Sequence, residues 1–223
     1  IPPVIKNLII INGLVWLAEI TMGNSVFEWM INNLALHDAH SQFFKPHQLV
    51  TYMFLHDNHE FQHILFNMFA LWMFGAVLEN YWGGKRFLVF YMISGIGAAV
   101  AQLLVLYHET APIAAAAQQY YPEDRLLFLA QSGVDNPTLG ASGAVFGCLA
   151  AFGYLFPNQY IYLYFFVPIK VKWFVLGYAA IELFSGVNSA AGDNVAHWAH
   201  LGGGLVGLLL VIYWNRTNRR NFY

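Results

Sequence analysis

The sequence predicts an all-α integral membrane protein, folded as a single bundle of six transmembrane helices. Of its 223 residues, 58% are hydrophobic and 10% are charged, whereas an ordinary soluble domain carries about 25% charged residues. Six apolar stretches approach the roughly 20 residues that a helix needs to cross the hydrocarbon core of a bilayer. No internal repeat divides the chain, so we expect one membrane domain over residues 1–223.

The six predicted spans differ in length and composition. The first lacks the small-residue cleavage signature of a signal peptide, so we expect it to be a span. The fourth and fifth are short and rich in small residues, which allow helix backbones to approach closely. We therefore expect these two helices to be buried among their neighbours rather than to face lipid. The predicted spans are, in order, 3–22, 62–81, 86–107, 141–156, 173–187 and 196–214.

The positive charges predict the orientation of this bundle, because lysine and arginine concentrate on the cytoplasmic side. Only Lys45 and Arg125 fall on the opposite side. We expect a multi-pass protein of a cell membrane, plasma or inner, with both termini in the cytoplasm. The loops 23–59, 108–139 and 188–195 would then lie outside. The residues that share the cytoplasmic side are Lys6, Lys85, Arg86, Lys170, Lys172, Arg216, Arg219 and Arg220.

Charge and cysteine content narrow the class of function. The net charge of −2 indicates no nucleic-acid partner, and the single cysteine, Cys148, excludes a disulfide framework and a cysteine-rich metal site. His56, His59 and His63 leave a metal-dependent hydrolase open as an alternative. Their segment, HDNHEFQH, lacks the H-E-x-x-H pattern, so we expect neither metal nor cofactor. The paired broken helices of a transporter are not visible in the sequence.

A serine flanked by glycines, Ser142 in GASGAVFG, opens the fourth span at the outer face. Gly140, Gly143 and Gly147 allow neighbouring helices to approach and leave space beside the hydroxyl. A serine bonded back to its own helical turn is the common structural explanation. The pattern also differs from the G-x-S-x-G elbow of soluble hydrolases, because Ala144 takes the place of the last glycine. The motif alone leaves the role of Ser142 open.

Two histidines at the start of the sixth span, in AHWAHLGGGLVG, are candidates for a general base. His197 lies at a depth similar to that of Ser142, and ionisable groups inside a membrane are usually functional. A packed or interfacial histidine is the structural alternative for His197. His200 lies one turn deeper and is either the base or a packing residue, since its spacing to Gly204 resembles a small-xxx-small helix contact.

His63 and Asn67, four residues apart in HILFN, share one face of the second span. An imidazole and a carboxamide can donate hydrogen bonds to the oxygen that becomes negative during acyl transfer. Interhelical hydrogen bonding explains either residue alone equally well. Three separate spans nevertheless place polar groups at a similar outer depth, which favours a common site.

These motifs together resemble the rhomboid family of intramembrane serine proteases. GASGAVFG, AHWAHLGG and HILFN, the last followed by ENYWGGKRF, carry the resemblance, which covers about residues 44–214. It implies a six-helix bundle with a polar, water-filled cavity that opens outward. It also implies that Ser142 is the nucleophile and that His197, rather than His200, is the catalytic histidine.

The resemblance implies further roles in the same site. The oxyanion would be stabilised by His63, Asn67 and the backbone amide of Ser142. Phe146 would pack against the ring of the catalytic histidine. The loop 188–195, with the adjoining fifth span, would form a movable cap and a lateral gate.

The chain also departs from the family pattern. In the first outer loop, His47 and Gln48 stand where the family often has a Trp-Arg pair, and the long loop 108–139 contains LLFLAQSG, which predicts an extra interfacial helix. Two acidic residues are expected to be structural. Glu19 should snorkel from the first span, and Glu79 should pair with a cation or cap a helix.

We therefore expect an intramembrane serine endopeptidase that cleaves single-span transmembrane proteins near the outer membrane face, through a Ser-His dyad and an acyl-enzyme. A dyad is expected because Asp135 and Asp193 lie outside the spans. Glu182, inside the fifth span, is expected to be hydrogen-bonded or to reach the cavity, without an assigned role. The partners would be such substrates and membrane lipid. The alternative is a rhomboid-like pseudoprotease that binds membrane clients without cleaving them.

Overall fold

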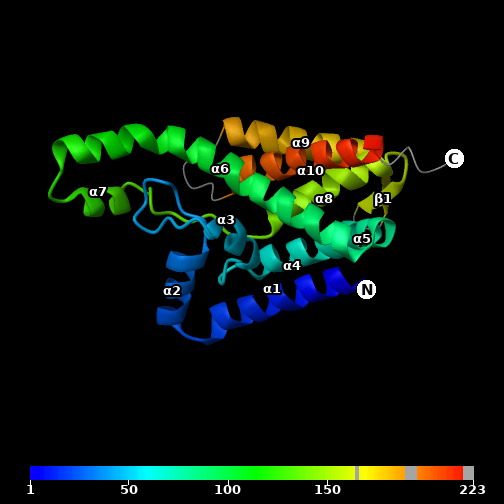
Figure 1. Cartoon of the computed structure of the whole chain (residues 1–223), viewed down its shortest axis with the longest axis horizontal. Coiled ribbons are helices and arrows are strands. Elements are labelled where there is room, and N and C mark those ends of the chain that lie inside the picture. Colours follow the sequence, from blue (N-terminus) through cyan, green and yellow to red (C-terminus); the bar gives the residue numbers. More distant parts are fainter. Residues whose placement is uncertain (164–165, 189–194, 218–223) are drawn as a thin grey trace.

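The computed structural model describes residues 1–163, 166–188 and 195–217 and is mainly helical. Each predicted span coincides with a helix or a run of helices (Figure 1). These elements are α1 (Pro3–Thr21), the run of α4 (Phe61–Ala70), the π-helical turn η2 (Leu71–Gly75) and α5 (Ala76–Trp82), then α6 (Gly84–Tyr120), α8 (Ser142–Leu155), α9 (Val171–Val187) and α10 (His197–Thr217).

Within the described residues, four of these six elements are long and apolar enough to cross a membrane. They are α1, the run 61–82, α6 and α10. Helix α8 is apolar but has only 14 residues, so it is shorter than the hydrocarbon core that a typical span crosses. The chain is therefore a helical membrane protein, and the count of six crossings stays a prediction.

Helices α6, α8 and α10 form the centre of the bundle because small residues let their backbones touch. A Cβ atom on Gly203 of α10 would collide with the carbonyl group of Gly143 in α8, and one on Gly207 would lie 2.7 Å from the Cα atom of Gly147. A Cβ on Gly143 would in turn collide with Ala98 of α6. Eight residues of α8 are buried, which confirms the predicted burial of the fourth span.

Helix α9 differs from this prediction. Val171 and Glu182 are its buried residues, and its large apolar side chains are exposed, with Phe184 70% accessible. In a bilayer these side chains face lipid. The expectation that the fifth span is enclosed by protein was wrong, because its glycine and alanine residues do not form a continuous contact face.

The two acidic residues of the first two spans connect elements distant in the sequence. Both carboxylate oxygens of Glu79, at the end of the second span, accept hydrogen bonds at the start of α1, from the amides of Val4 at 2.9 Å and Ile5 at 2.8 Å. A helix leaves these first amides without intrahelical acceptors, so Glu79 caps α1. Glu19 does not snorkel. It is 2% exposed and accepts a hydrogen bond from the amide of His56.

Helix α6 is longer than predicted. It has 37 residues, about 55 Å at 1.5 Å per residue, whereas the hydrocarbon core is about 30 Å thick. The segment 108–120, expected as loop, continues the helix past the rest of the bundle (Figure 1). There α7 (Arg125–Gln131) folds back on it, with Leu129 packed among Ala114 and Ala117. Helix α7 confirms the extra helix expected from LLFLAQSG. Its position relative to a membrane stays a prediction.

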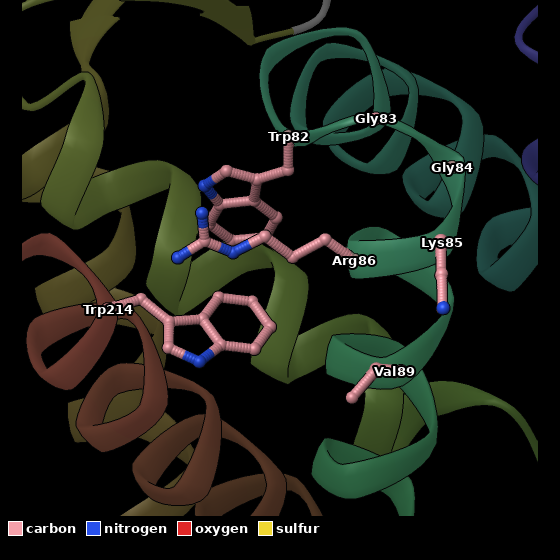
Figure 2. A pocket seen from close by; sticks show the side chains of 7 residues that line it. All are labelled: Trp82, Gly83, Gly84, Lys85, Arg86, Val89 and Trp214. Atoms are coloured by element: carbon pink, nitrogen blue, oxygen red, sulfur yellow. The ribbon is translucent and has the colours of Figure 1, made fainter. Parts of the chain in front are cut away.

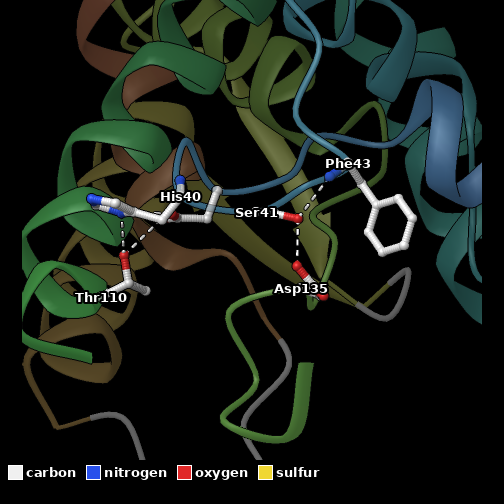
Figure 3. A network of polar contacts seen from close by, with 6 residues as sticks. His40, Ser41, Phe43, Thr110 and Asp135 are labelled. Carbon is white, nitrogen blue, oxygen red and sulfur yellow. Dashed lines mark hydrogen bonds and ion pairs between the residues drawn. The ribbon is translucent and has the colours of Figure 1, made fainter. Parts of the chain in front are cut away.

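Polar contacts fasten the first long loop to this extension (Figure 3). The hydroxyl of Thr110 in α6 donates a hydrogen bond to Asp38 at 3.1 Å and lies 3.0 Å from a ring nitrogen of His40. The hydroxyl of Ser41 donates to Asp135, beyond α7, at 2.5 Å. These bonds tie two loop segments and the extension of α6 into one layer at this end of the bundle.

The remainder of the first loop contains α2 (Asn24–Leu34), α3 (Gln48–Thr51) and the 3₁₀ turn η1 (Tyr52–Phe54). Gln48 is fully buried and holds the loop, since its amide group accepts hydrogen bonds from the amides of Lys45 and His37 and donates one to the carbonyl of Phe43. Gln48, which together with His47 stands where the family often has a Trp-Arg pair, therefore supports the loop by its own contacts.

A β-hairpin that the sequence analysis missed joins α8 to α9. Strand β1 (Tyr160–Leu163) pairs antiparallel with β2 (Val167–Lys170), with Tyr160 opposite Lys170. The fold is thus not strictly all-α. The hairpin lies at the end of the bundle where α1 begins and α10 ends (Figure 1).

A shallow pocket of about 480 Å³ lies at the same end, between the α5–α6 junction and α10. Figure 2 shows the guanidinium group of Arg86 beside the indole rings of Trp82 and Trp214. Its central carbon lies 4.3 Å from the ring centroid of Trp214, which is within the range of a cation–π interaction. The stacking joins α10 to the start of α6.

Candidate active site

The predicted site residues lie at the opposite end of the bundle from this pocket. His63 is near the start of α4, Ser142 is the first residue of α8, and His200 is in the first turn of α10. Glu182 is in the second half of α9, which runs toward the same end (Figure 1). Four helix ends therefore bring these polar groups into one region.

Ser142 contacts a histidine, but the partner is His200 rather than the predicted His197. The Oγ atom of Ser142 lies 2.8 Å from Nε2 of His200. Ser142 is partly buried and His200 is 8% exposed, so the bond is shielded from bulk solvent. A histidine at this distance from a serine hydroxyl can take its proton.

The packing of α10 explains why His200 faces Ser142. Gly203 and Gly207 contact α8, and His200 precedes them by three and seven residues, so all three share one face of the helix. His197 lies one turn earlier and is rotated toward α9, where a Cβ on Gly186 would lie 3.3 Å from its Cβ atom. The helix contact expected from the spacing of His200 and Gly204 is displaced by one residue, because Gly203 makes the close approach to α8.

Phe146 packs on the histidine that contacts Ser142. The rings of Phe146 and His200 are stacked, with centroids 4.3 Å apart and an interplanar angle of 6°. The prediction that Phe146 packs on a histidine holds for His200, not for His197. Tyr178 of α9 also contacts Phe146, with ring centroids 4.8 Å apart. The stack limits rotation of the His200 ring.

A carboxylate missed as a site residue completes the contacts of the histidines. Oε2 of Glu182 lies 2.9 Å from Nδ1 of His200 and 2.7 Å from Nδ1 of His197. Glu182 is 4% exposed. The available signal was the presence of an acidic residue within an apolar span, since such residues are usually paired and functional. The spacing in sequence could not identify its partners, because α9 and α10 are separate helices.

His63 lies beside Ser142, whereas Asn67 contacts the backbone of His63. A Cβ on Gly140 would lie 2.8 Å from Nε2 of His63 and 3.8 Å from Oγ of Ser142, so both groups flank this glycine. Asn67 is buried one turn further along α4, and its side-chain amide donates to the carbonyl of His63 at 2.9 Å. Ser142 begins α8, where backbone amides lack intrahelical acceptors. Oxyanion stabilisation by these groups stays a prediction.

The histidine segment considered as a metal site is not arranged as one. His56 is fully buried with its ring centroid 5.1 Å from that of His63, whereas His59 is exposed. Among the described residues, the group of donor atoms close enough to surround a metal ion is instead that of Glu182, His197 and His200, within 4.8 Å of one another. Within this group, hydrogen bonds join both histidines to a single carboxylate oxygen.

The predicted cap lies mainly outside the described residues. Residues 189–194, including Asp193, belong to the loop 188–195 and are not described. Asp135, the other acid considered, accepts the hydrogen bond of Ser41 in the loop layer. The fold and the site define a class of protein: a helical membrane protein with a serine–histidine pair near one end of its bundle.

Sequence comparison identifies the family within that class. Residues 44–216 match the Rhomboid domain, and the chain belongs to the rhomboid family. This range agrees with the region over which the motifs show the resemblance.

The similar proteins include mitochondrial and bacterial members. Rhomboid protein 1 of Saccharomyces cerevisiae mitochondria is 33% identical over 158 residues, 71% of this chain and 39% of the yeast protein. Rhomboid protease AarA of Providencia stuartii is 30% identical over 173 residues, 72% of this chain and 53% of AarA. The putative rhomboid protease YdcA of Bacillus subtilis is 27% identical over 99% of this chain and 92% of its own. The chain thus spans only about half, or less, of the first two relatives.

Proposed function

We propose that this protein is an intramembrane serine endopeptidase, with Ser142 as nucleophile and His200 as general base. The observation that carries the proposal is the 2.8 Å contact between Ser142 Oγ and His200 Nε2 in a chain whose Rhomboid domain match covers both residues. His200 takes this role in place of His197, because Nε2 of His200 is the ring nitrogen within hydrogen-bond distance of Ser142 Oγ.

The proposed reaction proceeds in two acyl-transfer steps. As Ser142 Oγ attacks the carbonyl carbon of the scissile peptide bond, Nε2 of His200 takes the hydroxyl proton. The tetrahedral intermediate collapses as His200 gives that proton to the leaving amine, and an ester to Ser142 remains. Water, deprotonated by His200, then attacks the ester carbonyl and releases the acid product and free serine.

The negative oxygen of each tetrahedral intermediate requires hydrogen-bond donors. We assign this role to Nε2–H of His63, the side-chain amide of Asn67 and the backbone amide of Ser142. The proximity of His63 to Gly140 and Ser142 supports the first assignment. Asn67, bonded to the carbonyl of His63, would also orient that helical turn.

The proposed substrates are single-span membrane proteins, cleaved near the outer face in a water-filled cavity that opens outward. The proposed topology has six spans and both termini in the cytoplasm. The site lies at the end of the bundle away from the start of α1 and the end of α10 (Figure 1), which agrees with that topology. Helix α9, whose apolar side chains are exposed, is the proposed lateral gate.

Purified protein in detergent and in proteoliposomes tests the proposal. A fluorophosphonate probe should label wild-type protein at Ser142, and a generic single-span substrate should yield two products identified by mass spectrometry. Ser142→Ala should lose both signals and retain its thermal unfolding temperature. A folded wild-type protein that binds the substrate but neither cleaves it nor reacts with the probe would indicate the pseudoprotease alternative.

A further inference from the structure

Glu182 is an acidic side chain in an apolar helix, and its surroundings require an explanation. The neighbouring side chains of Ile181, Leu183 and Phe184 are exposed on the outer surface of α9, whereas Glu182 is 4% exposed and is directed at α10. An ionised group in a membrane is costly unless it is hydrogen-bonded and paired. The two histidines of α10 supply hydrogen bonds to this carboxylate.

A single oxygen atom of Glu182 orients both rings. Oε2 lies 2.7 Å from Nδ1 of His197 and 2.9 Å from Nδ1 of His200. Because a carboxylate only accepts hydrogen bonds, each Nδ1 carries the proton. The neutral ring of His200 then has an unprotonated Nε2, which is the atom 2.8 Å from the Ser142 hydroxyl. The carboxylate thus selects the tautomer that can accept the serine proton.

We propose that Glu182 is a positioning residue that extends the expected dyad to a Ser142–His200–Glu182 triad, an inference that rests on the proposed protease function. It holds Nδ1 of His200 as a donor and stabilises the positive ring formed when Nε2 takes the proton. Glu182 keeps its charge throughout and transfers no proton.

His197 has a supporting role in this triad. Its Nδ1–H bond to the same oxygen satisfies a second lone pair and limits rotation of the carboxylate. The other titratable groups around His200 are His63 of α4 and Tyr178 of α9, whose ring contacts that of Phe146. Among the described residues of these elements, Glu182 is the carboxylate bonded to His200, so its removal leaves the protonated ring without that opposite charge.

Steady-state kinetics on four variants test the inference. Glu182→Gln keeps the shape but can donate a hydrogen bond to Nδ1, which favours the wrong tautomer; we expect kcat to fall by about 10²–10⁴-fold with little change in KM. Glu182→Asp should recover part of kcat. His197→Gln should cost less than Glu182→Gln. Glu79→Gln, a carboxylate-to-amide change at the other end of the bundle, is the matched control and should retain kcat.

Two measurements separate positioning from folding. Fluorophosphonate labelling of Ser142 needs no peptide substrate and should slow in Glu182→Gln as kcat does. Proton NMR of protein with labelled histidines should show a strongly downfield Nδ1–H signal for His200, absent from Glu182→Gln. Circular dichroism and thermal unfolding should remain close to wild type for the variants compared.

The outcomes are distinct. Equal kcat in wild type and Glu182→Gln would overturn the positioning role of Glu182. A loss confined to KM, or a loss that Glu182→Asp does not reduce, would also overturn it. Wild-type activity abolished by a chelator and restored by zinc would also overturn it, since Glu182 would then be a metal ligand. If wild type itself neither reacts with the probe nor cleaves substrate, the protease proposal fails, independently of Glu182.

Discussion

At the scale of single residues, the position of a histidine on α10 decides whether it contacts Ser142. His197 and His200 are both 8% exposed and both bonded to Glu182. Only His200 has its second ring nitrogen on Ser142 and its ring stacked on Phe146. Two similar histidines therefore have different proposed functions, base and support.

The first prediction compares these histidines. His200→Ala should reduce kcat by about 10³-fold or more, because serine loses the group that takes its proton. His197→Ala should retain measurable turnover, since Glu182 still holds His200. Cleavage of a fluorogenic substrate and labelling of Ser142 report both effects. Greater activity in His200→Ala than in His197→Ala would restore His197 as the base.

The second prediction concerns the oxyanion. His63→Ala should reduce kcat by about 10²–10³-fold, the usual loss of one fully used donor, with a smaller change in KM. Asn67→Ala should lose less if its main bond is the one to the carbonyl of His63. Titration of substrate at constant enzyme concentration separates the two parameters. A change in KM alone would show that these side chains bind substrate or pack helices.

The third prediction concerns acid stability. Burial, together with the adjacent imidazole of His63, lowers the pKa of His56 from 6.5 to about 3. A histidine with a depressed folded-state pKa stabilises the fold above its unfolded pKa and loses this contribution as the pH falls. Between pH 6.5 and pH 3 the loss approaches about 1.4 kcal/mol per pH unit as an upper bound.

Thermal unfolding of detergent-solubilised protein checks this dependence. The unfolding temperature should fall as pH is lowered from 7 to 4, and the fall should be smaller in His56→Phe, which keeps an aromatic ring without a titrating group. His59→Phe is the matched control, because His59 is exposed and should leave the pH dependence unchanged. Identical acid profiles for wild type and His56→Phe would contradict the assignment.

Sequence reasoning identified most of the polar residues of the site but not their pairing. Ser142 and His63 were recognisable because glycine spacing and helical periodicity are local properties. The choice between His197 and His200 depends on the rotation of α10, which is determined by the contact of Gly203 with Gly143. The role of Glu182 cannot be predicted from its sequence position, since its partners belong to a different helix.

At the scale of elements, glycine contacts determine both packing and site geometry. The α8–α10 contact allows no side chain at Gly203, because the opposing atoms belong to the backbone of Gly143. Backbone cannot move aside as a flexible side chain can. The helices must separate to accommodate any added atom, and the Ser142–His200 distance would change with them.

The fourth prediction tests this coupling. Gly203→Ala should destabilise the protein by about 1–3 kcal/mol or more, as expected for overpacking, and should lower activity although it touches no reacting group. Gly13→Ala in α1 is the matched control, because no atom other than its chain neighbours and the backbone of its own helix lies within 4 Å of its added Cβ and alanine favours helix. Unfolding temperature and cleavage rate measure both. Full activity and stability in Gly203→Ala would refute the close contact.

Apolar periodicity predicted the positions of the helices, but not all their lengths or environments. The α6 extension was missed because residues 108–120 contain polar residues and Pro112, which resemble a loop. Packing of α7 on Ala114 and Ala117 stabilises that segment instead. The hairpin β1–β2 was missed because its four-residue strands give a weak pattern.

At the scale of the whole molecule, the arrangement of charged and reactive groups relates the fold to the membrane. The polar site lies at the end of the bundle away from Lys85 and Arg86, which line the pocket in Figure 2. If lysine and arginine mark the cytoplasmic side, the site faces outward. Under the proposed function, a transmembrane substrate would then approach laterally in the outer half of the bilayer.

The fifth prediction follows from this position. A protease can attack only a carbonyl group that is released from helical hydrogen bonds, so a substrate span must unwind near the site. We expect cleavage near the outer end of the span, after a small residue such as alanine and close to a helix-destabilising glycine or proline.

A substrate series in which the span is progressively replaced by leucine, with the cut located by product mass in proteoliposomes, measures both the position of the cut and the rate of cleavage. The rate should fall as leucine replaces the glycine and proline residues, while an inner-end substitution of the same size should leave it unchanged. Efficient cutting of an all-leucine span would contradict the unwinding requirement, and a cut at the cytoplasmic end would reverse the proposed topology.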